Sequence, residues 1–194
     1  MTRRDAFLAK VRAAQPKAIE RDALPYFPAT FDSSRQARFA AALAAMGGLC
    51  ITLAAGVTPA AYVAERFGAA ATIASALDSV PGTRTLAPDT PPASLEDVDV
   101  GVVRARFGVA ETGSVWFSEI EYRVNAVGYL AQHLVVLLDP AMLVDGLQDA
   151  YRRDDFARAR YAALVTGPSA TADIEGVLIR GAQGVRSLTV LWAA

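Results

Sequence analysis

The sequence contains few of the residues that most often carry chemistry. Its 194 residues include one cysteine, Cys50, and one histidine, His133. One thiol excludes an intrachain disulfide and an iron–sulfur cluster of the usual kind, which needs about four cysteine ligands. One imidazole excludes a paired-histidine metal site. We therefore expect no metal and no bound cofactor, and we expect Cys50, which lies in an apolar run, to be a buried core residue.

An excess of one charge and a long apolar run are also missing. The 19 Lys and Arg residues are offset by 20 Asp and Glu residues, so the chain has no basic field to hold nucleic acid. No segment reaches the roughly 18 uninterrupted apolar residues of a membrane span. Near the start, Asp5 and Lys10 interrupt the apolar stretch that a signal peptide needs. These absences favour a cytoplasmic location, with no nucleic-acid partner and no membrane span.

The first half of the chain is predicted to form helices separated by short strands. Residues 5–15 have apolar spacing typical of a helix, followed by an irregular, proline-containing arm to about residue 30. A second helix is expected from residues 32–34 to Gly47, and a third from a Thr58 cap to Gly68. Short strands are expected at 49–55 and 71–77. Residues 81–97 hold four of the ten prolines and indicate a long connection.

The second half is richer in strands. Strands are predicted within 97–110 and 113–124, then at 133–139, 161–167 and 187–193, with helices from Pro140 to about residue 153 and over 169–179. Apolar strands that alternate with helices are typical of an α/β sheet covered on both faces. We expect a single domain over 1–194, with a helical arm at about 1–30 and a proline-rich connection at about 81–97.

Several common catalytic motifs are absent. Neither lysine lies in a phosphate-binding P-loop, and no G-x-G-x-x-G follows a predicted strand. The stretch GPSAT around Ser169 resembles the start of a nucleophile elbow, but Thr171 occupies the position where that motif needs glycine. A serine hydrolase and a Rossmann-type dinucleotide enzyme are therefore not expected.

The stretch TGPSATADIEG, residues 166–176, is the first candidate for a ligand loop. It follows a predicted strand, and open α/β sheets bind ligands beyond the carboxyl ends of their strands. Gly167 permits a tight turn, and Ser169 or Thr171 can cap a following helix whose free N–H groups attract anions. Asp173 fits either a ligand contact or an interaction with the helix dipole. The alternative is that the whole stretch is a capped turn with no ligand.

The stretch AETG, residues 110–113, is the second candidate. In one reading Glu111 is a pocket carboxylate that acts as nucleophile or base, beside Thr112 and backbone donors freed by Gly113. In the other, the stretch is a hairpin turn in which Gly113 adopts a positive φ.

Four further residues complete the predicted site. Arg123 can bind a substrate carboxylate through its two-pronged guanidinium or be a surface residue. His133 begins an apolar strand and is either a proton shuttle or a core histidine. Gln183 and Gly184 lie in a glycine-flanked loop before the last strand. The neutral side-chain amide of Gln183 can form hydrogen bonds with amide or carbonyl groups of a ligand.

Taken together, three stretches resemble a known family. The stretches DVDVGVVRARFGVAETGSVWF, RVNAVGYLAQHLVVLLD and TGPSATADIEGVLIRGAQGVRSLTVLW follow the pattern of the LUD domain, the LutC/YkgG-like family of lactate-utilization proteins, over roughly residues 95–194. The resemblance implies a three-layer α/β fold like that of the NagB/RpiA/CoA-transferase group. It also implies an accessory role in oxidising L-lactate to pyruvate, beside iron–sulfur partner subunits and with a small anionic ligand. The loops carrying Glu111, Ser169 and Gln183 are then expected to converge on one pocket.

The chain departs from the family pattern at two places. The family usually has a G-x-H-G-P-like loop near the C-terminus, where this chain has Gln183 and Val185, and a proline shortly before the strand-opening histidine, where Ala131 stands here. Two alternative functions stay open on fold analogy. One is a CoA-transferase or acyl-transfer enzyme with Glu111 as nucleophile, and the other is a nucleotide-binding protein like the cyclo-ligases.

Overall fold

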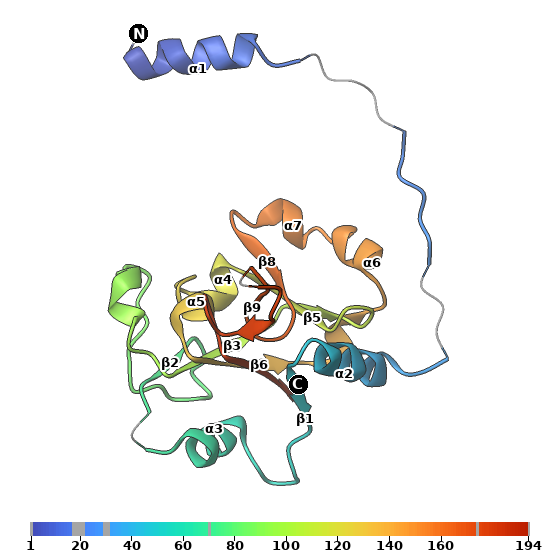
Figure 1. The fold of residues 1–194 in the computed structure, drawn as a ribbon, viewed down its shortest axis with the longest axis vertical. Helices are drawn as coiled ribbons and strands as arrows, with labels where there is room; N and C mark the ends of the chain where they lie inside the picture. Colours follow the sequence, from blue (N-terminus) through green and yellow to red (C-terminus); the bar gives the residue numbers. More distant parts are fainter. Residues whose placement is uncertain (1, 17–21, 29–31, 70, 174, 194) are drawn as a thin grey trace.

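The computed structural model describes residues 2–16, 22–28, 32–69, 71–173 and 175–193. Helix α1 (Arg3–Ala13) begins at a Thr2 cap whose hydroxyl accepts from the Asp5 N–H. Figure 1 shows α1 apart from the rest of the molecule, and none of its residues is buried. The helix expected at the N-terminus is therefore present, but it packs against no core in this chain.

A five-stranded parallel sheet forms the centre of the fold. Its strands lie in the order β1 (Leu49–Ile51), β11 (Ser187–Trp192), β6 (His133–Leu138), β3 (Val100–Arg104) and β2 (Ile73–Ser75). Side chains alternate between its faces. Val135 and Leu137 pack toward α3 (Pro59–Phe67), whereas Leu134 and Val136 belong to the larger core on the other face. Burial on both faces explains why these strands are continuous apolar runs.

A second, mixed sheet lies beyond that larger core, in the order β7 (Leu143–Val144), β4 (Phe107–Val109), β5 (Ser114–Ser118) and β8 (Ala162–Val165). Val115 and Phe117 face the parallel sheet, whereas Phe107 and Trp116 face outward. That outer face is covered by residues of α6 (Leu147–Tyr151) and α7 (Asp155–Arg158). The expected α/β class is confirmed, and the parallel sheet forms a middle layer between α3 and this second sheet with its helices (Figure 1).

The remaining helices lie between or before strands. Helix α2 (Arg35–Ala45) precedes β1, and η1 (Pro92–Leu95) lies between β2 and β3 of the parallel sheet. The two sheets are connected by α4 (Glu119–Tyr122) and α5 (Val127–Leu130), between β5 and β6, and by η2 (Pro140–Met142), between β6 and β7. Within the proline-rich connection, the Arg84 N–H donates to the Ile73 carbonyl at 2.9 Å, so this segment covers the outer edge of β2. The buried Leu86 and Leu95 anchor the same segment to the core.

Local signals placed three helix boundaries correctly. Ser34 caps α2, and Thr58 caps α3 with Pro59 at its first turn. Helix α3 ends at Gly68, which adopts a φ of 78°. These boundaries depend on contacts within a few residues, so they need no knowledge of the rest of the fold.

Three predicted elements were wrong. The helix expected from Pro140 is instead η2, then β7, and only after Gly146 the short helix α6, because residues 143–144 pair with β4. The helix expected over 169–179 is a hairpin of β9 (Ala170–Thr171) and β10 (Ile179–Arg180). Glu175 and Gly176, both at positive φ, turn the chain between them. The strand expected to run through 119–122 is α4, because Ser118 and Glu121 form a capping box.

Two smaller expectations concern membranes and the lone thiol. In the described part of the chain, no helix is long and apolar enough to span a membrane. Cys50 packs against the core but is only half-buried, and desolvation raises the pKa of its thiol to about 12. Cys50 was predicted to be a buried core residue, and it does pack against the core, but its burial is partial because β1 is an edge strand of the parallel sheet.

Candidate anion-binding pocket

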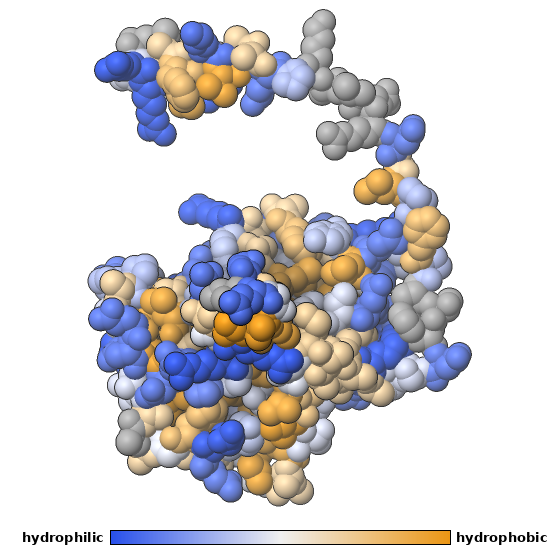
Figure 2. Space-filling view, in the orientation of Figure 1, coloured by the Kyte–Doolittle hydropathy of each residue, from blue (hydrophilic) through white to orange (hydrophobic). Residues whose placement is uncertain are grey.

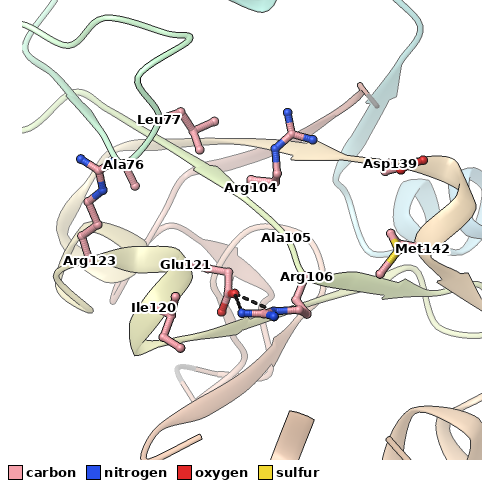
Figure 3. A pocket seen from close by; sticks show the side chains of 10 residues that line it. All are labelled: Ala76, Leu77, Arg104, Ala105, Arg106, Ile120, Glu121, Arg123, Asp139 and Met142. Carbon is pink, nitrogen blue, oxygen red and sulfur yellow. Dashed lines mark hydrogen bonds and ion pairs between the residues drawn. The ribbon is translucent and has the colours of Figure 1, made fainter. Parts of the chain in front are cut away.

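A cavity of about 460 Å³ opens at the carboxyl ends of three parallel strands (Figure 3). Ala76 follows β2, Arg104 ends β3, and Asp139 follows β6. This is the position where open parallel sheets bind their ligands, because loops from several strands meet there. We call this cavity the arginine pocket, after Arg104, Arg106 and Arg123 in its lining.

One of the three arginines is neutralised by a carboxylate. Arg106 Nε donates to Glu121 Oε1 at 2.8 Å and Arg106 Nη2 lies 2.6 Å from the same oxygen, as the dashed lines in Figure 3 mark. The other oxygen, Glu121 Oε2, accepts from the N–H and the hydroxyl of Ser118. Only 9% of the Glu121 side chain is exposed. This network holds α4 against the end of β5 and leaves little free charge on Arg106.

The other two arginines are more available to a ligand. Arg104 Nη1 donates to the Ala193 carbonyl at 3.1 Å, a neutral partner. Arg123 Nη2 lies 3.1 Å from Asp78, whose side chain is 94% exposed. Ion pairs at such exposed positions contribute little free energy. Among the lining residues three arginines face two carboxylates, Glu121 and Asp139, and Asp78, which pairs with Arg123 from outside the lining, is the third carboxylate nearby.

The backbone at Arg123 is strained. Arg123 has φ 57° and ψ −47°, and the Val124 N–H donates to the Tyr122 carbonyl at 2.6 Å. These values describe a γ-turn of the rarer hand, which is unfavourable for a residue with a side chain. Strain of this kind persists where the surrounding structure demands a particular direction of the chain, and it is frequent at ligand sites. The turn separates α4 from the segment leading to α5 and presents the Arg123 side chain at the pocket.

The remaining walls are apolar. Leu77, Ile120 and Met142 line the pocket together with two alanines. A guanidinium beside short apolar side chains suits a small organic anion, since the carboxylate pairs with the cation and the carbon chain contacts the walls. Among the described residues, no group of three or more His, Cys, Asp and Glu side chains is arranged to hold a metal ion.

Four of the sequence-predicted residues line a second cavity of about 330 Å³, which we call the neutral cavity. They are Gly167, Ser169, Gln183 and Gly184. The Ser169 N–H donates to Val185, and the Ser169 carbonyl accepts from Gly181. The structure thus brings TGPS and GAQG together as expected. It places them beside β8 of the mixed sheet rather than at the carboxyl edge of the parallel sheet.

The AETG turn lies near the neutral cavity, but none of its residues lines that cavity or the arginine pocket. Thr112, Ser114 and Thr166 form a chain of hydroxyls with oxygen–oxygen distances of 2.7 and 2.5 Å. Gly113 adopts φ 68° as the hairpin reading predicts, and its N–H donates to Val109. Glu111 points elsewhere, with Oε2 accepting from the Leu147 N–H at the start of α6 at 2.9 Å. The structure therefore does not bring Glu111 to Ser169 and Gln183.

The last predicted residues also lie apart from one another. His133 stands at the amino end of β6, where Nδ1 is 2.8 Å from Ser187 Oγ. Burial, reinforced by Arg66 and Arg186, lowers the pKa of His133. Thr171 and Asp173 lie on the β9–β10 hairpin and bond to each other, with Thr171 Oγ1 donating to Asp173 Oδ2 at 2.7 Å. Of all the predicted side chains, only Arg123 lines the arginine pocket.

Comparison with known proteins decides the family. The family model described as the LUD domain matches residues 93–192, just over half of the chain. This chain belongs to the LUD domain family. The resemblance seen in the sequence is thereby confirmed, and membership associates this LUD-domain protein with lactate utilization at the level of the family.

Structural comparison supports the fold of this LUD-domain protein. A crystal structure of a DUF162 family protein from Deinococcus radiodurans superposes with a TM-score of 0.62 and 14% identity, over 82% of this chain and 96% of that one. At this identity the likeness shows the fold alone. No curated protein matches the sequence.

Reasoning from the sequence missed three residues of the site in this LUD-domain protein. The residues missed are Arg104, Arg106 and Glu121, which lie in stretches predicted to be strand. The sequence VVRARF has two arginines two residues apart at the end of an apolar run, and in the structure β3 ends at Arg104 while Arg106 lies just before β4. That pattern was an available signal. Glu121 was harder to find, because its importance comes from Arg106, 15 residues away in sequence.

Proposed function

We propose that this LUD-domain protein is a cytoplasmic accessory component of an L-lactate-oxidising system and binds a small monocarboxylate, lactate or pyruvate, in the arginine pocket. The observation that carries the proposal is that Arg104 and Arg123 line the pocket at the carboxyl ends of the parallel strands with weak partners, a neutral carbonyl and an exposed carboxylate. A guanidinium with such a partner can exchange it for the carboxylate of a ligand.

The residues have distinct roles in this proposal. Arg123 and Arg104 bind the carboxylate, and Arg106 with Glu121 fixes α4 so that Arg123 is held in place. Leu77 and Met142 contact the ligand's carbon atoms. Electron transfer is assigned to iron–sulfur partner subunits, as expected from the family, because the one cysteine here cannot ligate a four-thiolate cluster.

A thermal-shift titration tests the ligand. L-Lactate and pyruvate should raise the melting temperature by mass action, which is worth about 2.7 kcal/mol at 100 times the dissociation constant. Lactamide, a neutral analogue of lactate, should have no effect. Arg123→Gln and Arg104→Gln should each abolish the shift, whereas Arg158→Gln, which changes an arginine whose side chain is 80% exposed, should retain it.

Two results would contradict the ligand assignment. One is equal stabilisation by lactamide, which would show that the carboxylate is not recognised. The other is a wild-type response in both arginine variants.

The accessory role needs its own test: the tagged protein should retain a cysteine-rich iron–sulfur protein in an anaerobic pull-down from its native cells. Failure to do so would reject the assembly but leave the ligand result intact.

A further inference from the structure

The neutral cavity runs along the free edge of a strand. Its lining includes Ala163, Leu164 and Val165 in succession, followed by residues 166–169. Successive side chains of a strand point to opposite faces, so a cavity on one face would contact every second residue. Contact with three in a row places the cavity beside the backbone. In agreement, β8 is an outer strand that pairs only with β5 among the described strands.

The free edge leaves backbone groups without a strand partner. In an antiparallel pair, alternate residues exchange hydrogen bonds with the neighbouring strand, and the residues between them direct their N–H and C=O groups outward. Two of the four residues of β8 therefore offer a donor and an acceptor toward the cavity side. The outer edge of β2, in contrast, is covered, because the Arg84 N–H donates to the Ile73 carbonyl there. Unpaired edges of this kind are templates for another strand.

The walls of the cavity carry no formal charge. Among the described residues that line it there is no Asp, Glu, Lys, Arg or His. Burial raises the pKa of the Tyr129 phenol, so this side chain is neutral as well. The rest of the lining includes Gly128, Tyr129, Gln183 and Gly184, and the space is tight at Gly184, where an added Cβ would lie 3.0 Å from the Cβ of Ser169. An occupant must therefore be uncharged, narrow and able to pair with a strand backbone.

We propose that the neutral cavity binds an extended, uncharged peptide segment of a partner protein, which adds to the mixed sheet as a strand beside β8. Backbone hydrogen bonds give such a complex its affinity, and the cavity selects side chains by size. The volume of about 330 Å³ is at the small end of the range for ligand pockets, so two or three small residues fit. Figure 2 shows an apolar area at the centre of the view, where Figure 1 labels β9. Val177 and Leu178 of the β9–β10 hairpin are exposed and extend the contact surface.

An NMR titration of the full chain with a blocked tetrapeptide, acetyl-Ala-Val-Ala-Val-amide, tests the proposal. The expected result is chemical-shift change centred on the amides of Ala163–Thr166 and Gly184. Four further peptides, each N-methylated at one amide, then probe the pairing without altering the protein. Methylation at alternate amides should weaken binding about tenfold, because each removes one backbone hydrogen bond, whereas methylation at the amides between them should have a much smaller effect.

The outcomes are separable from those for the arginine pocket. Arg123→Gln should bind the tetrapeptide like the wild-type chain even though it loses the response to lactate. Absence of shift changes at β8, or equal effects of methylation at every position, would overturn the proposal. A concentration-dependent dimer in sedimentation, with the β8 amides perturbed on dilution, would assign the edge to a second copy and would overturn it as well.

Discussion

The arginine pocket and the neutral cavity use different parts of the chain to offer polar groups. In the arginine pocket the polar groups are side chains, brought together where three parallel strands end. In the neutral cavity they are chiefly backbone groups of an edge strand, and no formally charged side chain contributes. The contrast teaches that charged side chains in the sequence indicate a site like the arginine pocket. A site like the neutral cavity is found only from the pairing of the strands.

The two cavities share one structural connection. Tyr122 lies between Glu121 and Arg123, which line the arginine pocket, and its ring packs against Gly128 and Tyr129, which line the neutral cavity. Tyr122 is fully buried. Substitutions that affect one cavity and spare the other therefore test whether the two sites are independent.

The largest effect is expected from Gly113→Ala, in the turn that leads toward the neutral cavity. A Cβ at Gly113 would lie 2.3 Å from the Leu43 backbone nitrogen of α2, at a φ of 68°. Strain and displacement of α2 together should lower the free energy of unfolding by about 3–4 kcal/mol. Urea denaturation measures this. Gly56→Ala is the control, because Gly56 also has positive φ but has no neighbour within 4 Å, so only about 1 kcal/mol should be lost. Equal losses would show that the contact with α2 does not matter.

A smaller loss is expected from Glu121→Gln, in the arginine pocket. The amide cannot pair with Arg106 as a charge, and hydrogen bonds to charged groups contribute about 1.5–3 kcal/mol. We expect a loss of about 2 kcal/mol in urea denaturation and weaker lactate binding in calorimetry. Glu96→Gln, at an exposed position, should change neither quantity. Unaltered lactate affinity in Glu121→Gln would show that the network does not position Arg123.

Arg123→Gly should separate stability from binding. Glycine adopts the γ-turn without strain, so the free energy of unfolding should rise by about 1 kcal/mol even though lactate binding is lost. Arg123→Ala removes the same charge but keeps the strained backbone, and it should lose binding without any gain. Thermal unfolding of the two variants side by side provides the comparison. If alanine stabilises as much as glycine, the gain comes from removing the charge and not from the turn.

The smallest effect concerns His133, which lies at the amino end of the parallel strands and apart from both cavities. Its pKa is lowered in the folded chain, chiefly by burial. The unfolded chain then binds the proton more readily, so stability is complete above the ordinary histidine pKa of about 6.5 and is lost as pH falls toward the folded pKa. Denaturation between pH 7.5 and about 5 should show this decline, and His133→Gln should reduce it. An unchanged slope in the variant would assign the decline to other groups.

The sequence predicted elements better where local contacts decide them. The ends of α3 follow from Thr58, Pro59 and Gly68, all within one short segment. The parallel strands follow from their continuous apolar runs. The segment from Pro140 failed because β7 forms only through pairing with β4, more than 30 residues earlier. The 169–179 segment failed because Ala170 and Thr171 pair with Arg180 and Ile179 in a hairpin, with two residues at positive φ between the strands.

The same distinction applies to the site. Composition and motifs were enough to predict the α/β class and the LUD resemblance, and they singled out Arg123, which lines the arginine pocket. They could not show that Glu111 bonds to α6, that Ser169 and Gln183 share a cavity without it, or that Arg104 joins Arg123. Local propensity and apolar patterning are properties of neighbouring residues and are therefore readable in one sequence. Long-range strand pairing decides which strand edge stays open and which distant side chains meet at the end of a sheet. Only the tertiary structure shows that pairing.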